Sequence, residues 1–193
     1  MQSPEPVRFI DVTPFGVLTW LGQPGRSPER DVIECLLSMD CLRPVNLRAI
    51  CVSMSWSMAE LAKVLFVLNR SQGVQVDTGR PLRNESGGDA LAGLDDDLQT
   101  LAEAGQRTLL ATSDGLCMAA SGWSVEEADV VASGHAVGGE AGNAAQVVPL
   151  FFARERVVFC ADTRVDLSHP SWVRMARRLL RACGPLGYCP EPA

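Results

Sequence analysis

The sequence lacks the features that many enzyme classes and membrane proteins require. It has only two histidines and one lysine in 193 residues, and no Gly-x-Gly-x-x-Gly, P-loop or Gly-x-Ser-x-Gly motif. No run of about 18 uncharged apolar residues occurs, so no membrane span is predicted. The first residues carry neither a basic patch nor an apolar stretch. We therefore expect no signal peptide, and a cytoplasmic protein.

Metal and cofactor sites are also not predicted. Of the seven cysteines, the closest pairs are Cys35 with Cys41 and Cys183 with Cys189. Zinc ligands usually lie about two to four residues apart, which is closer than either pair. The number of cysteines is odd and most stand in apolar segments, so we expect reduced, buried thiols and no cofactor.

The net charge of −6 disfavours binding to nucleic acid by phosphate neutralisation, unless positive charge gathers in one patch. The one basic concentration is on the predicted last helix. This concentration could contact DNA or an acidic partner, and the simpler alternative is a solvated helix face. It consists of Arg174, Arg177, Arg178 and Arg181.

The composition predicts a globular chain in two modules. Hydrophobic residues make up 47% and charged residues 21%, which is ordinary for a folded protein. Glycine, proline and asparagine cluster between residues 78 and 89, where the hydrophobic pattern stops. We place an N-terminal module at 1–80, a linker at 81–88 and a C-terminal module at 89–193.

The N-terminal module is predicted to resemble a winged helix. One or two short strands are expected in 9–20, broken at 14–16, followed by a helix over 28–39 that begins at Ser27-Pro28. A shorter helix starts near Asn46, and a third has a capping box of Ser57 and Glu60. A strand over 73–77 follows. This order of helices and strand is similar to a winged helix at the level of pattern only.

The third helix would be the recognition helix if this module bound DNA. Its outward positions include Lys63 and Arg70, without a cluster of arginines or amides to contact base edges. A packing or protein-docking role is the alternative interpretation.

The C-terminal module is predicted to alternate helices and hairpins. A helix spans 89–104 with Asp95, Asp96 and Asp97 mostly outward; strands at 107–113 and 116–122 are joined by a type I′ turn at Asp114-Gly115. A helix over 124–137 is capped by Ser124 and Glu127. Two strands, 147–152 and 156–162, and a last helix from about residue 169 complete an α+β fold.

This order resembles the roadblock (dynein light chain) family, a profilin-like antiparallel sheet flanked by helices. The resemblance is in the apolar strand from Thr108, the Asp114-Gly115-Leu116 turn, the small-residue strand ending at Gly122, and the acidic-starting helix from Val125. It covers about residues 89–182. The family usually has three strands after the middle helix, and only two are predicted here.

The resemblance implies a non-enzymatic scaffold or regulator that forms a homodimer through the middle helix and a sheet edge and binds a Ras-like small GTPase or its complex. We expect no membrane insertion. The apolar stripe of the middle helix would serve a dimer contact, but a helix needs the same stripe to cover its own sheet. Both interpretations of the stripe stay open. The alternative function is a DNA-binding transcriptional regulator dimerised by this module. The candidate dimer or partner surface comprises Val125, Ala128, Val131, Ala132 and His135.

No catalytic constellation is predicted. Ser133 and His135 are two positions apart on one helix, where side chains do not face each other. His169 precedes Pro170 at a helix start, which is typical of a capping or surface role. A nucleophilic Cys117 would require a thiol of unusually low pKa.

Overall fold

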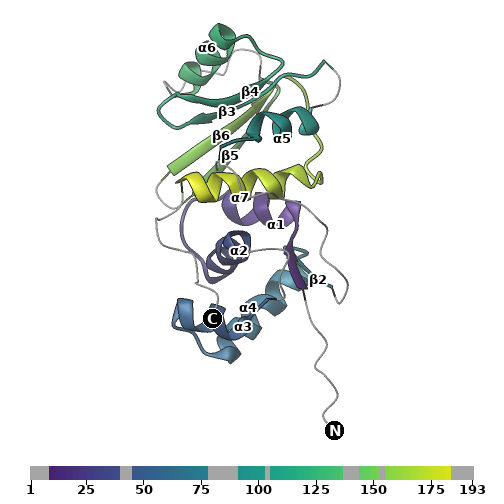
Figure 1. The fold of residues 1–193 in the computed structure, drawn as a ribbon, viewed down its shortest axis with the longest axis vertical. Coiled ribbons are helices and arrows are strands. Elements are labelled where there is room, and N and C mark those ends of the chain that lie inside the picture. Colours follow the sequence, from purple (N-terminus) through teal and green to yellow (C-terminus); the bar gives the residue numbers. More distant parts are fainter. Residues whose placement is uncertain are drawn as a thin grey trace.

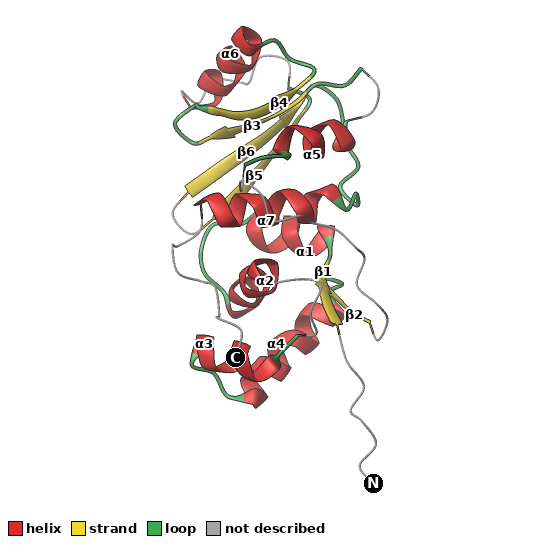
Figure 2. Ribbon diagram, in the orientation of Figure 1, coloured by secondary structure: helices red, strands yellow, loops and turns green. Residues whose placement is uncertain are grey.

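A computed structural model describes residues 9–39, 45–77, 91–102, 105–136, 144–152 and 155–183. Within these ranges the chain is a mixed α/β protein with seven helices and two antiparallel sheets (Figures 1 and 2). The helices are α1 Pro14–Leu21, α2 Pro28–Ser38, α3 Leu47–Met54, α4 Met58–Arg70, α5 Leu94–Leu101, α6 Val125–Ala136 and α7 Ser171–Cys183. The strands are β1 Phe9–Val12, β2 Val74–Asp77, β3 Thr108–Thr112, β4 Cys117–Ser121, β5 Gln146–Phe152 and β6 Glu155–Ala161.

The larger sheet lies between two unequal layers of helix. Its strand order is β4-β3-β6-β5, all antiparallel. Helix α6 packs on β3 and β4 from one side, while α5 and α7 cover the other side (Figure 1). β6 is central, and Val157 to Ala161 are all buried because both of its faces are covered. The sheet thus separates α6 from the rest of the helices.

Helix α7 joins the two halves of the chain in one core. It contacts α5 and β5 on one side and α1 and α2 on the other, and α2 in turn contacts α4 (Figure 2). One continuous cluster of buried side chains includes Val17 of α1, Leu37 of α2, Trp172 of α7 and Phe152 of β5. The two halves therefore share a hydrophobic core, although the predicted linker, 81–88, lies outside the described residues.

Arg30 ties the N-terminal half to the edge of the large sheet. Its side chain is only 6% exposed and donates to the Gln23 carbonyl at 2.8 Å, to the Gly25 carbonyl at 3.1 Å and to the carbonyl oxygen of Phe151 on β5. The Arg30 Nε donates to Glu34 Oε1 at 2.7 Å. The buried guanidinium is satisfied by these acceptors, as a buried charge requires.

Most predicted elements are present. The helices expected at 28–39, near 47, after Ser57 and at 124–137 appear as α2, α3, α4 and α6, and the strands expected at 73–77, 147–152 and 156–162 appear as β2, β5 and β6. Both predicted capping boxes form. The mixed α+β class is confirmed at this level.

The prediction of strands through residue 20 was wrong after Val12. Residues 14–21 form helix α1, in which the Thr13 hydroxyl accepts a hydrogen bond from the Gly16 amide at 3.0 Å and Pro14 is the first helical residue. The β-branched and aromatic content favoured a strand, but a Thr cap followed by Pro is the stronger local signal.

Two details of the C-terminal module also differ from expectation. Helix α5 starts at Leu94, after Gly93 with φ of 83°, instead of at residue 89. In the β3–β4 connection only Gly115 has positive φ, whereas a type I′ turn needs two such residues. The connection is a longer loop in which the Leu116 amide donates to the Thr112 hydroxyl at 3.1 Å, and the ladder shifts register at Leu110 and Ala111.

Candidate functional site

Helix α6 presents one side to its sheet and the other to solvent. Ala128 and Ala132 are 3% and 0% exposed, and Ala132 packs with Leu109 and Val158 of the sheet. The outer side carries Val130, which is 72% exposed, and Val125 is 76% exposed because it is the first residue of the helix, before the part that packs on the sheet. These exposed valines give the helix apolar surface that is not covered by the described residues.

The structure therefore narrows the predicted dimer or partner surface. Ala128 and Ala132 are used by the sheet and cannot reach a partner, and Val131 is partly buried in the same cluster. Val125 remains accessible, while the side chain of His135 lies outside the described atoms. Val130 belongs to the accessible side and was missed, because the sequence pattern alone does not fix which stripe of a weakly amphipathic helix faces the sheet.

Acidic groups surround these valines. Glu126, Glu127 and Asp129 are all exposed, and α6 contains no lysine or arginine. Hydrogen bonds from the Ser124 backbone and side chain hold the pKa of Glu127 below its usual range. Glu127 therefore stays ionised, and its charge also suits the amino-terminal end of the helix dipole.

A second exposed surface, of opposite character, is formed by α3 and α4. The two helices are bent by 108° from each other across the short turn at 55–57. Ser57 and Glu60 cap α4, with the Ser57 amide donating to Glu60 Oε2 at 2.7 Å. Exposed apolar side chains lie among exposed cations here: Val52 (79%), Met58 (46%), Phe66 (65%) and Val67 (43%), with Arg48, Lys63 and Arg70.

The bent pair has one further property. No single helix in the described part of the chain is long and apolar enough to cross a membrane, and only α3 and α4 taken together have the required length and apolar composition.

The arginines of α7 are largely engaged inside the molecule. Asp97 of α5 is 4% exposed, so it is not part of the predicted outward acidic face, unlike its exposed neighbours Asp95 and Asp96. Its carboxylate accepts from Arg174 Nε at 2.8 Å and from Arg178 Nε at 3.0 Å. This arrangement joins α5 to α7.

Few of the α7 arginines predicted to contact DNA or an acidic partner are therefore available for such a contact. Arg174 and Arg178 are paired with Asp97, and Arg178 also donates to the Ala92 carbonyl oxygen. Arg177 is 7% exposed, so it is buried in the fold. Arg181 is the member of this set whose side chain is open to solvent.

The thiols of Cys35, Cys117 and Cys160 do not favour nucleophilic chemistry. Burial raises the pKa of Cys35 to about 11 and that of Cys160 to about 12. Burial, followed by the nearby Asp129 charge, also raises the pKa of Cys117, which is opposite to what a nucleophile at this position needs. His169 accepts a hydrogen bond from the Ser171 amide at the start of α7, at 3.2 Å, as a capping residue would.

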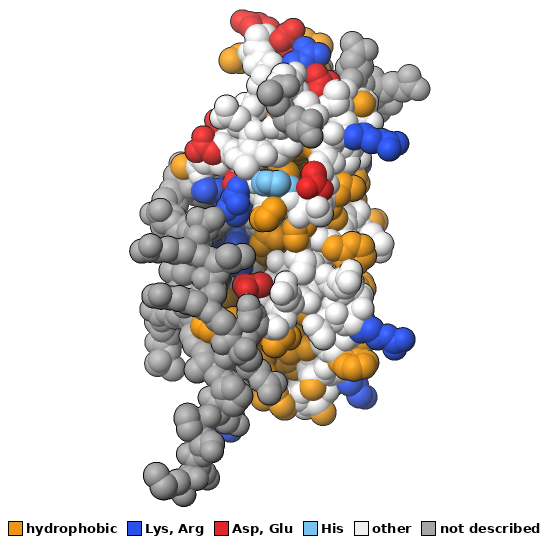
Figure 3. All heavy atoms as spheres, turned by 90° about the vertical axis from the view of Figure 1, so that its right-hand side faces the viewer, with side chains coloured by type: hydrophobic (Ala, Val, Ile, Leu, Met, Phe, Trp, Pro, Cys, Tyr) orange, Lys and Arg blue, Asp and Glu red, His pale blue; other side chains and the backbone are white. Residues whose placement is uncertain are grey.

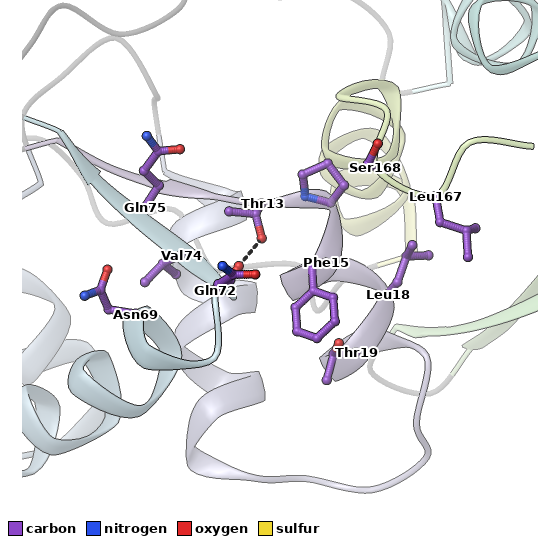
Figure 4. A pocket seen from close by; sticks show the side chains of 11 residues that line it. Thr13, Phe15, Leu18, Thr19, Asn69, Gln72, Val74, Gln75, Leu167 and Ser168 are labelled. Atoms are coloured by element: carbon purple, nitrogen blue, oxygen red, sulfur yellow. Dashed lines mark hydrogen bonds between the residues drawn. The ribbon is translucent and has the colours of Figure 1, made fainter.

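An open groove of about 750 Å³ lies where α1, the end of α4, β2 and residues 167–168 meet (Figure 4). The Thr13 hydroxyl donates to the Gln72 carbonyl at 2.6 Å at its wall. None of the described residues that line it is charged. Sequence reasoning missed it because its walls come from three separate segments. The lining residues are Thr13, Pro14, Phe15, Leu18, Thr19, Asn69, Gln72, Val74, Gln75, Leu167 and Ser168.

Neither the groove nor the other described parts of the chain hold a group of three or more histidine, cysteine or acidic side chains placed to bind a metal ion. No protein-family model, curated protein or solved structure matches the chain.

Proposed function

We propose that this chain is a non-enzymatic protein-interaction module that binds a Ras-like small GTPase or its complex and self-associates as a homodimer. In this proposal the C-terminal half is roadblock-like and the N-terminal half is winged-helix-like. The element order α5, β3, β4, α6, β5, β6, α7 supports it, since it is the order predicted for residues 89–182, with two strands between α6 and α7 where the family usually has three. The antiparallel sheet with helices on both faces supports it as well.

The observation that carries the proposal is the outer side of α6. Val130 on this side and Val125 at the first position of the helix are more than two-thirds exposed, and the inner side of the helix packs on the sheet. A rigid surface can discriminate between two shapes of a partner through a difference in affinity alone. The chain would thus favour one nucleotide-bound state of the GTPase without catalysing a reaction.

The test is a binding titration of the purified chain with Ras-like GTPases loaded with GDP or with a non-hydrolysable GTP analogue. We expect at least a tenfold difference in Kd between the two states, and a loss of at least tenfold on Val130→Asp. Val76→Asp is the matched control, because Val76 is an exposed valine (46%) on β2, away from α6. Equal affinity for both states, or no binding, would contradict the proposal.

A DNA-binding regulator is the second candidate, and the α3–α4 geometry favours it. Two helices at about 90–120° joined by a three- or four-residue turn are typical of a helix-turn-helix. Lys63 and Arg70 are exposed on α4, the second helix. Affinity for DNA that falls steeply with salt would distinguish this function from the first.

A further inference from the structure

We propose that copies of this chain associate head to tail, with the outer side of α6 of one copy packing on the α3–α4 surface of the next. The inference rests on the self-association in the proposed function, but it replaces the closed homodimer by an open assembly, in which a second copy and the GTPase compete for the outer side of α6. The two surfaces lie at opposite ends of the long axis of the molecule (Figure 1). Each surface is thereby free to contact a different neighbour.

The α3–α4 surface is basic and apolar. Ala59, Lys63, Phe66 and Arg70 recur at spacings of four, three and four residues, which places them on one stripe of α4. Phe66 is therefore flanked by two cations along the helix. With Arg48 of α3, the surface carries three cations against one exposed anion, Glu60, for a net charge of +2.

The α6 surface is acidic and apolar. Three exposed acids, Glu126, Glu127 and Asp129, accompany Val125 and Val130, and the helix has no lysine or arginine. Figure 3 shows acidic side chains at this end of the molecule, with a basic one among them, and hydrophobic and basic ones at the other end. The two ends are complementary in charge, and both offer apolar side chains for burial.

Charge selects the pairing of unlike ends. An α6–α6 contact would bring Glu126 and Asp129 of two copies together, and an α4–α4 contact would do the same with Lys63 and Arg70. Like charges facing each other oppose association, whereas α6 against α4 brings opposite charges together. Such a heterologous contact leaves one end free on each terminal copy, so assembly continues instead of closing at two copies.

The experiment is light scattering over a concentration series. The weight-average mass of the unmodified chain is expected to rise with concentration without a plateau at the dimer, and to fall with added salt. Two variants block opposite ends: Val130→Asp on α6 and Phe66→Asp on α4. Each variant alone is expected to be monomeric, since every contact needs one intact surface of each kind.

Mixing the two variants is the decisive arm. A Phe66→Asp copy keeps an intact α6 and a Val130→Asp copy keeps an intact α3–α4 surface, so the mixture is expected to form a dimer and nothing larger. Phe15→Asp is the control, because Phe15 is an exposed aromatic residue (53%) on a different helix, and should keep the unmodified mass profile. Circular dichroism is measured to check that each variant is folded.

Four outcomes would overturn the inference. A chain that stays monomeric removes self-association from the proposed function as well. A closed dimer whose mass is unchanged by Phe66→Asp would exclude the head-to-tail geometry, but it would agree with the homodimer of the proposed function. A mixture of folded variants that stays monomeric excludes the contact between unlike ends. Binding of anionic vesicles through Phe66, without any increase in mass, would assign the α3–α4 surface to lipid.

Discussion

Several of the less exposed charged side chains in this protein are paired with specific partners. Asp162 illustrates this at the end of β6: its two carboxylate oxygens accept from the Arg107 amide at 3.0 Å and from Arg107 Nε at 2.9 Å. The same guanidinium lies over the Trp123 ring, 4.1 Å from its centre. One arginine thus connects the end of the sheet with the loop before α6.

These contacts predict a dependence of stability on acid. Burial raises the pKa of Asp162, but the hydrogen bonds from Arg107 and the positive charge of Arg107 together lower it by more. The net pKa is below the ordinary 3.8. Because the folded-state pKa is depressed, the contribution is complete above pH 3.8 and is lost as the pH falls through the folded value. Denaturation at a series of pH values should show a smaller acid-side decline in the free energy of unfolding for Asp162→Asn. An identical slope in both proteins would contradict this assignment.

Individual ion pairs were not predictable from the sequence. Asp97 stands in a run of three aspartates, and periodicity alone gave no reason to bury one of them. It is buried because α7, some 77 positions later, brings Arg174 to it. The prediction of buried cysteines holds in part: Cys35 and Cys160 are buried, whereas Cys51, Cys117 and Cys183 are only half-buried.

At the scale of single elements, local capping signals were the most reliable guide. Ser27-Pro28 and Ser57 with Glu60 mark helix starts that the structure confirms. Thr13-Pro14 is the same kind of signal, and α1 was missed only because strand-forming residues surround it. The bounds of α5 were too wide because its apolar periodicity continues beyond the part that is helical.

Two glycines in helices predict opposite effects of the same substitution. A Cβ added at Gly16 of α1 would lie 2.9 Å from the carbonyl carbon of Gly73 and closer still to its oxygen, whereas one at Gly134 of α6 meets no atom within 4 Å. Gly16→Ala should lower the free energy of unfolding by about 1–3 kcal/mol because α1 must move away from the backbone before β2. Gly134→Ala should raise it by about 0.5–1 kcal/mol through helix propensity.

Urea denaturation of the two variants checks this pair. Equal effects of both substitutions would show that the close approach of α1 to Gly73 does not limit stability.

For the molecule as a whole, the packing of one half on the other could not be derived from the sequence. The glycine-rich segment at 78–89 predicts a boundary between modules, yet Leu21 and Trp172 belong to one buried cluster. Hydrophobic periodicity shows that α7 has a buried side but not that both the sheet and α1 contact it. The groove at α1 and β2 was hidden for the same reason, since it exists only after distant segments meet.

A shared core predicts that both halves unfold together. Hydrogen exchange measured by mass spectrometry should give similar opening free energies for the most protected amides of α2 and β6. Arg30→Ala should lower the opening free energies of α2 and β6 together, by about 2–4 kcal/mol. The substitution removes a buried guanidinium and leaves three carbonyl oxygens and Glu34 without their hydrogen-bond donor.

The exposed Arg26 supplies the control, and Arg26→Ala should change either value by less than about 0.5 kcal/mol. Much faster exchange in α2 than in β6 in the unmodified protein would show that the halves open separately.

The central place of α7 also has a consequence for biosynthesis. Helices α1 and α2 are made early, but the surface on which they pack is completed by a helix that begins at Ser171. During translation their apolar side chains must wait for well over a hundred further residues before they can be covered. Nascent chains with such exposed surface are the usual clients of chaperones that act at the ribosome. Synthesis slowed before α7 should therefore increase aggregation more than synthesis slowed after it.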